Sequence, residues 1–175
     1  NIEIPTTLTY DMSCLRQGDG LYQMQMSISK YLADNGFYEV MNNSLTKAEY
    51  AQQFDFLNEA ETVKLLNPLS SELNAMRQTL LFSGLENVMR NVNNKMVDLR
   101  LFDVGKTYHL NTETTASEDV TVRYQEKEMM SMFVTGRLGE DNWEGKMPSA
   151  DFFYLRNMVD NFLLKINFPL ENVQL

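Results

Sequence analysis

The sequence is poor in the residues that build metal sites and nucleophilic sites. Its 175 residues include one cysteine, Cys14, and one histidine, His109. A single cysteine excludes a disulfide framework within the chain and fits a reducing, cytoplasmic setting. Zinc sites combine several thiolate or imidazole ligands, so most zinc chemistry is excluded too. Any triad-type nucleophilic device would have to use His109 as its imidazole base.

Long apolar runs and positive charge are also scarce. No stretch approaches the roughly 20 apolar residues of a membrane span, and the first residues lack the basic-then-apolar order of a secretory signal. The net charge of -9 is opposite in sign to that of proteins that bind nucleic acid mainly by neutralising phosphates. Apolar residues make up 43% of the chain, enough for one sizeable core. Composition therefore predicts one soluble cytoplasmic domain, and the missing initial Met indicates a piece of a larger protein.

Apolar spacing predicts three long helices, over residues 21–35, 79–93 and 151–167. Met24, Ile28 and Leu32 lie on one face of the first helix, which we expect in the core. The second carries a longer apolar stripe, formed by Leu80, Leu81, Leu85, Val88, Met89 and Val92. Gly84 lies inside this second helix at a cost of about 1 kcal/mol relative to Ala, which indicates a close packing contact.

The helix ends carry recognisable signals. Gly36 stands where a left-handed residue ends a helix, and Asp151 is a good N-cap for the last one. Thr46 and Glu49 have the spacing of a capping box, which predicts a short helix over 46–54.

Strands are expected over 37–44, 63–66, 99–110 and 127–138, with the third central because it is apolar on both faces. Successive strands without regular crossover helices favour an α+β fold, with a largely antiparallel sheet flanked by helices. We expect residues 1–20 to be a lead-in from a preceding domain. We expect residues 21–175 to be the domain itself, truncated at its C-terminal end, with a further strand beyond it.

Five segments, in this order, resemble the class II synthetase-like domain of bacterial phenylalanyl-tRNA synthetase beta chains. They are Tyr31–Val40 (YLADNGFYEV), Asn67–Ser70 (NPLS), Met76–Leu81 (MRQTLL), Leu101–Tyr108 (LFDVGKTY) and Asp151–Arg156 (DFFYLR). The first is similar to the first signature motif of class II aminoacyl-tRNA synthetases. The resemblance implies a class II fold and an enzyme of two alpha and two beta chains. In that enzyme the alpha chain activates phenylalanine with ATP and transfers it to tRNA.

In this family the beta-chain domain has the catalytic fold without the catalytic function. A class II site holds the α-phosphate of ATP with an arginine, followed by a glutamate, after the second-motif strand. Here His109 stands in place of the arginine and Asn111 in place of the glutamate, and the third motif would lie beyond Leu175. We therefore assign no catalytic, cofactor-binding or metal-binding residue to this chain. ATP and magnesium belong to the parent enzyme, whose shared magnesium site the resemblance places upstream of Asn1.

The resemblance also implies a partner surface. We expect the exposed face of residues 21–44 to contact the alpha chain, with slight tRNA contact and no membrane contact. Arg77 is interpreted as an anchor for its turn rather than a phosphate ligand, and His109 as a structural or exposed side chain. Most methionines are expected in the core and about a third at a subunit contact; the candidates are Met24, Met26, Met129, Met130 and Met132.

Two alternatives stay open. One is a divergent class II domain that retains weak ATP or amino-acid binding. The other is an unrelated α+β binding module that resembles the family by chance.

Overall fold

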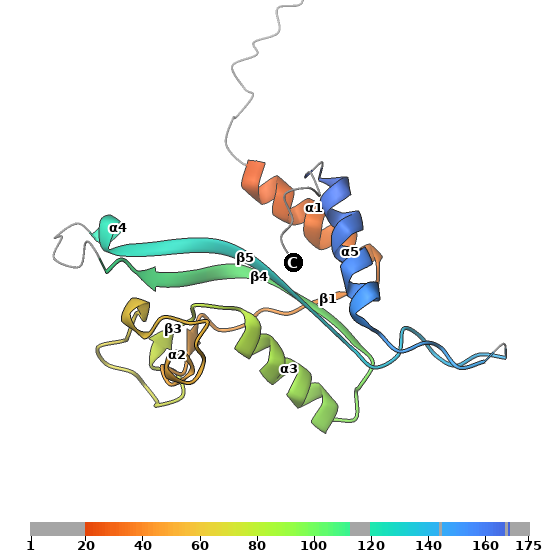
Figure 1. Cartoon of the computed structure of the whole chain (residues 1–175), viewed down its shortest axis with the longest axis horizontal. Coiled ribbons are helices and arrows are strands. Elements are labelled where there is room, and N and C mark those ends of the chain that lie inside the picture. Colours follow the sequence, from red (N-terminus) through yellow and green to blue (C-terminus); the bar gives the residue numbers. More distant parts are fainter. Residues whose placement is uncertain (1–19, 113–119, 144, 167, 169–175) are drawn as a thin grey trace, which may run out of the picture.

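Two long antiparallel strands, β4 (Leu99–Leu110) and β5 (Tyr124–Thr135), form the centre of the fold (Figure 1). This computed structural model describes residues 20–112, 120–143, 145–166 and 168. The strand expected over 99–110 is confirmed, whereas the one expected over 127–138 is shifted toward the N-terminus. It stops before Gly136, whose φ of 70° lies in the left-handed region that favours glycine.

A short strand, β1 (Tyr38–Glu39), pairs parallel to β4 and completes a sheet of order β1-β4-β5. The longer strand expected over 37–44 is wrong. Val40 donates the last ladder hydrogen bond, to the carbonyl of Phe102 at 2.8 Å. Two residues on, the side chain of Asn42 donates to Asp103 instead, at 2.8 Å.

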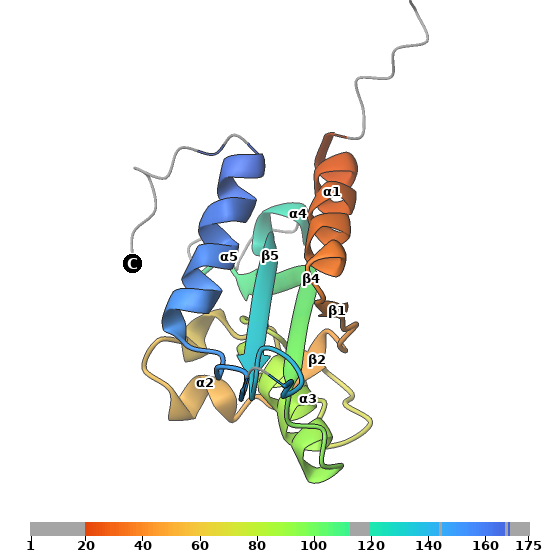
Figure 2. The same cartoon turned by 90° about the vertical axis from the view of Figure 1, so that its right-hand side faces the viewer.

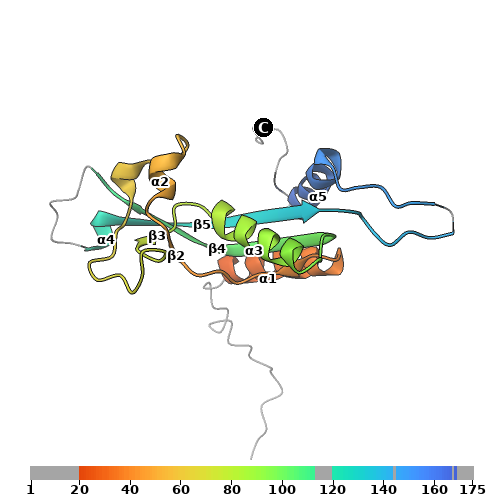
Figure 3. The ribbon, with the colours of Figure 1, turned by 90° about the horizontal axis from the view of Figure 1, so that it is seen from below.

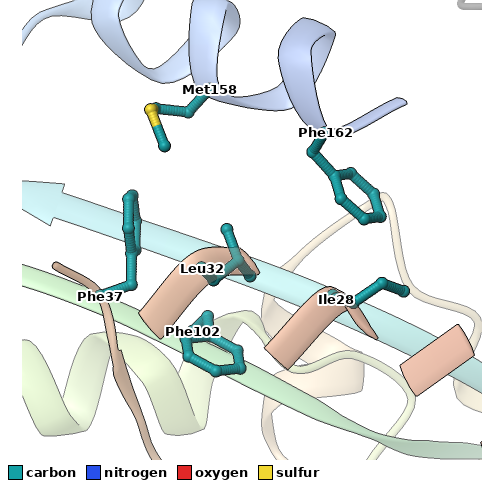
Figure 4. Close-up of a cluster of buried hydrophobic side chains, with 6 residues drawn as sticks. All are labelled: Ile28, Leu32, Phe37, Phe102, Met158 and Phe162. Carbon is teal, nitrogen blue, oxygen red and sulfur yellow. The ribbon is translucent and has the colours of Figure 1, made fainter. Parts of the chain in front are cut away.

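Helices α1 (Gly20–Asp34) and α5 (Phe152–Lys165) pack together on one face of this sheet (Figures 1 and 2). The core lies between them and the strands, and its buried members are Ile28, Leu32, Phe37, Phe102, Met158 and Phe162 (Figure 4). Alternate residues of β5, namely Met130, Met132 and Val134, pack half-buried against this cluster. As expected, Gly36 follows α1 with a φ of 82°, and the Asp151 carboxylate caps α5 by accepting from the Tyr154 N–H at 2.8 Å.

Several side chains expected inside are exposed. On α1, Ile28 and Leu32 are buried, but Met24 and Met26 are 43% and 52% exposed, so the expected core stripe covers only the second half of the helix. On α5, Phe152 is exposed, whereas Met158 and Phe162 are buried.

Helix α3 (Leu81–Asn93) lies against the opposite face of the sheet (Figures 1 and 3). A Cβ added to Gly84 would lie 2.0 Å from the ring of Phe133 on β5, so the expected close contact at this glycine is confirmed. The apolar stripe of this helix is not buried as a whole. Leu80, just before the helix, is buried, whereas Leu81, Leu85, Met89 and Val92 are exposed.

Short elements cluster near the C-terminal end of β4 and the N-terminal end of β5. One pair of them, β2 (Leu45–Thr46) and β3 (Ala75–Met76), is antiparallel. The other short elements are α2 (Tyr50–Gln53), the 3₁₀ helix η2 (Glu59–Glu61) and α4 (Val120–Arg123). The capping box is wrong because Thr46 is held in β2, and the Glu49 side chain makes no cap hydrogen bond. The strand expected over 63–66 is reduced to a single bridge between Lys64 and Ala75.

The expected fold class is confirmed. The chain is α+β, with one parallel strand pair beside antiparallel ones, and helices cover both faces of the main sheet. The proposed division at residue 20 stays a prediction, because residues 1–19 lie outside the described part of the chain.

Candidate functional site

A buried ion pair lies between the sheet and α3. Arg77 follows β3 and is 5% exposed, and Asp103 of β4 is 2% exposed. Their Nη1 and Oδ2 atoms are 3.6 Å apart. Arg77 Nε donates to the carbonyl of Lys106 at 2.9 Å, which fixes the plane of the guanidinium.

Amide side chains extend this pair to α3. Asn42 donates to the Asp103 carboxylate at 2.8 Å, and Asn87 of α3 donates to the Asn42 carbonyl oxygen. Gly105 makes room for the arginine, because a Cβ there would lie 2.2 Å from Arg77 Nη2. The network thus joins four segments of the chain. Arg77 anchors its turn, as the sequence indicated, and its guanidinium is turned inward rather than toward a ligand.

The single histidine lies at the edge of a concavity of about 500 Å³ at the C-terminal end of β4. His109 Nδ1 is 3.2 Å from a carboxylate oxygen of Glu61 in η2, and Nε2 is 3.4 Å from the hydroxyl of Thr107. Both ring nitrogens therefore have partners within the fold. Asn111, which stands where a class II site has glutamate, also lines this concavity, together with Gln125 and Lys127.

Few of the side chains around this concavity are suited to binding a nucleoside triphosphate. Phosphate clamps use arginines with planar forks of donors. In the described lining, the positive charge comes from Lys127, while the Glu61 carboxylate beside His109 would repel a phosphate. His109, which is paired within the fold, and the amide of Asn111 are the residues that the resemblance aligns with the arginine and glutamate of a class II site.

A second, larger concavity of about 840 Å³ runs between α3 and residues 41–47. Its lining includes five amide side chains: Asn42, Asn43, Asn87, Asn93 and Asn94. Its charged groups are largely tied to one another, because Lys47 pairs with Glu72 and the Tyr50 hydroxyl donates to Glu86 at 2.7 Å. The first contact raises the pKa of Lys47, and the second raises the pKa of Tyr50.

Two exposed apolar surfaces belong to helices α1 and α3, and these helices lie on opposite faces of the sheet (Figure 2). The first is the N-terminal half of α1, where Leu21, Tyr22 and Met26 are 51%, 60% and 52% exposed. The second is the α3 stripe, defined here as Leu81, Leu85, Met89 and Val92. Scattered apolar side chains are ordinary on a protein surface, whereas contiguous groups on one helix are typical of contacts with other chains.

Two other kinds of feature were searched for, a metal-binding cluster and a membrane-spanning helix. Within the residues that the structure describes, no cluster of three or more His, Cys, Asp or Glu side chains could hold a metal ion. No helix in that same part of the chain is long and apolar enough to cross a membrane. Cys14 lies outside it.

Comparison with known proteins connects these sites to a family. Residues 4–175 match the family model described as "Phenylalanyl tRNA synthetase beta chain CLM domain". The phenylalanine–tRNA ligase beta subunit of Bacteroides thetaiotaomicron is 35% identical over 173 residues, which cover 99% of this chain and 21% of that one. The corresponding subunit of Staphylococcus saprophyticus is 30% identical over 144 residues, covering 82% and 17%. The chain thus spans about a fifth of the length of these relatives.

The fold is similar to that of class II synthetases. A pyrrolysyl-tRNA synthetase structure from Desulfitobacterium hafniense superposes with a TM-score of 0.57, at 18% identity over 86% of this chain and 46% of that one. A second structure of this synthetase gives a TM-score of 0.56 at 16% identity, covering 85% and 48%. This likeness confirms the expected class II type of fold and says nothing of substrate.

Proposed function

The chain belongs to the phenylalanyl-tRNA synthetase beta chain family, as its CLM domain, and from this premise we propose that it is a non-catalytic scaffold and subunit-interface domain of phenylalanine–tRNA ligase. The parent enzyme would form phenylalanyl-tRNA from phenylalanine, ATP and tRNA in the cytoplasm. Its ATP and magnesium would be held by an alpha chain in an assembly of two alpha and two beta chains. The match across nearly the whole chain carries the proposal.

The His109 concavity supports the non-catalytic part of the proposal. Adenylate formation needs fixed positive charge aimed at a phosphate that gains charge in the transition state. His109 instead lies 3.2 Å from Glu61, and Arg77 is buried against Asp103. Neither side chain is oriented as a phosphate clamp.

Titration calorimetry tests this part directly. ATP with Mg²⁺, and phenylalanine, are each titrated into the chain, with AMP and leucine as matched control ligands. We expect no saturable heat from any of the four. Saturable binding of ATP or phenylalanine, but not of the controls, would overturn the proposed role and establish the alternative, a divergent class II domain with residual ligand binding.

The exposed face of residues 21–44 supports the interface part. Leu21, Tyr22 and Met26 are half exposed on α1, and Met41, beyond β1, is 95% exposed. An apolar surface of this kind is what an alpha chain would cover on assembly. The net charge of -9 leaves little basis for direct tRNA contact by this domain.

Assembly is measured by analytical ultracentrifugation of this chain mixed with the separately prepared alpha chain. We expect a complex, and we expect Tyr22→Glu with Met26→Glu to weaken it. Trp143→Glu is the matched control, since Trp143 is 92% exposed and lies far from α1 along the chain. Unchanged assembly of the α1 variant would contradict the assigned surface. If the chain alone does not bind, the full-length beta chain is used, and no complex there would refute the interface role.

A further inference from the structure

Helix α3 turns a polar face toward the concavity of about 840 Å³ that lies between it and residues 41–47. The members of this face that line the concavity are Ser83, Asn87, Arg90 and Asn94. Their spacings of four, three and four residues place them on one side of the helix. Relative to Gly84, which meets the sheet, this polar face lies on one flank of α3 and the α3 stripe lies on the other.

Near the start of α3, the charged and hydroxyl groups of the concavity are paired with one another. Lys47 forms an ion pair with Glu72, and the Tyr50 hydroxyl donates to Glu86 at 2.7 Å. Both carboxylates are therefore engaged within the domain. This end of the concavity is polar but offers no unpaired cation among the residues that line it in the structure.

Near the end of α3, Arg90 is a cation without a counterion. Its side chain is exposed and makes no ion pair or hydrogen bond within the part of the chain that the structure describes. The amides of Asn87, Asn93 and Asn94, about one turn before and after it, line the same concavity. A guanidinium presents a planar fork of donors that matches an anionic oxygen pair, and the flanking amides add neutral donors. This end is suited to an anionic group.

The charge of the site favours a carboxylate over a phosphate. One arginine balances the single charge of a carboxylate and can bind both of its oxygens. A phosphate monoester carries close to two charges at neutral pH. Glu72 and Glu86 line the same concavity, so the additional charge would be repelled.

The rest of the lining complements peptide groups. An asparagine side chain combines a carbonyl acceptor with an N–H donor, the same two functions that a backbone amide has. Five asparagines line the concavity, and Leu45, Leu73 and Met89 add apolar wall for side chains. Its volume lies within the roughly 300–1,000 Å³ of sites that hold drug-sized ligands, which is enough for a short peptide.

We propose that this concavity binds a short peptide that carries a carboxylate. The carboxylate pairs with Arg90, and the peptide groups exchange hydrogen bonds with the asparagine amides. The carboxylate belongs either to a free C-terminus or to an acidic side chain, since both present the same pair of oxygens to the guanidinium. This inference goes beyond the proposed function and does not rest on it.

Saturation-transfer difference NMR tests the proposal, because it detects weak binding of small ligands to a large protein. The full-length beta chain that contains this domain is used without the alpha chain, so that Met41 at the rim stays uncovered. The probes are acetyl-tetraalanine with a free carboxylate, the same peptide as its C-terminal amide, and an amidated peptide with one glutamate. We expect saturable binding of a carboxylate peptide and binding at least about 10-fold weaker for the neutral amide.

Arg90→Gln removes the cation and keeps an amide donor. We expect it to weaken binding of the carboxylate peptide by at least about 10-fold, because a charge-assisted hydrogen bond is lost. Arg156→Gln is the matched control, since Arg156 is also an exposed helical arginine and pairs only with Asp160 on its own helix, α5. The control should bind like the unmodified chain. Circular dichroism should show both variants folded, because neither arginine is buried.

The outcomes separate the possible ligands. Binding of the free-carboxylate peptide that depends on Arg90 assigns a C-terminus, and the same result with the glutamate peptide assigns an acidic side chain. No saturable signal from either carboxylate peptide refutes the site, as does binding that Arg90→Gln leaves unchanged. Glucose 6-phosphate is added as a fourth probe. Its binding through Arg90, without binding of the peptides, would overturn the proposed class of ligand.

Discussion

Replacement of Arg77 by methionine should destabilise the domain more than any surface change. The substitution keeps much of the side-chain volume but leaves the Asp103 carboxylate, which is 2% exposed, without its cation. Removing one partner of a buried ion pair typically costs 3–5 kcal/mol. Arg77 also donates to the carbonyls of Lys106 and Asn43, which places the expected loss near about 4 kcal/mol. In a domain of this size that loss lowers the melting temperature by roughly 8–16 °C.

The assay is urea unfolding followed by circular dichroism, with two comparison variants. Arg137→Met breaks an exposed pair with Asp98, 3.1 Å apart, and should leave the midpoint of the urea transition almost unchanged. Arg77→Met combined with Asp103→Asn removes both charges, keeps an acceptor for Asn42, and should recover part of the loss. A loss below about 1 kcal/mol for Arg77→Met, or a double variant less stable than the single one, would refute the account of a buried, coupled pair.

Three further changes follow from the same structure. Gly84→Ala forces the Phe133 ring to move, since the two would lie 2.0 Å apart, and calorimetry should show a loss of about 1–3 kcal/mol despite the better helix propensity of alanine. Asp151→Ala removes the cap of α5 and should cost about 1 kcal/mol in urea unfolding; no loss would contradict the cap. Hydrogen bonds from Arg137 lower the pKa of Asp98, so this carboxylate stabilises the fold above about pH 4 and ceases to do so as the pH falls. Asp98→Asn should therefore reduce the difference in stability between pH 6 and pH 3, and an unchanged difference would contradict the assignment.

Sequence patterns correctly predicted the elements whose formation depends on residues that are close together along the chain. Apolar spacing located α1, α3 and α5, and Gly36 and Asp151 marked helix ends because their conformations depend on adjacent residues. The capping-box prediction was wrong because Thr46 pairs with Ala75, which is 29 residues further along the chain (75 - 46 = 29). A non-local strand pair thus overrode a pattern of four residues. Short strands such as β1 and β2 have no periodicity of their own to detect.

The surroundings of His109 and Arg77 were predictable only in part, because the partners of these side chains are also distant along the chain. The sequence placed His109 at a strand end, but its partner Glu61 is 48 residues away and no spacing rule connects them. Arg77 was correctly interpreted as an anchor for its turn, but its ion-pair partner Asp103 was not predicted. A signal was present: Asp103 interrupts an apolar strand expected to be central, and a buried carboxylate requires a partner.

The α3 stripe shows where such reasoning stops. Helical periodicity identifies the apolar face of α3, but it does not say which chain covers that face. Gly84 contained the missing information, because a glycine inside an otherwise good helix marks the side that approaches another element closely. Once that side is assigned to the sheet, Leu81, Leu85 and Val92, which lie about 60–100° around the helix from Gly84, must point elsewhere. An amide contact and a close-packed glycine therefore attach α3 to its own domain, and most of its apolar stripe stays exposed.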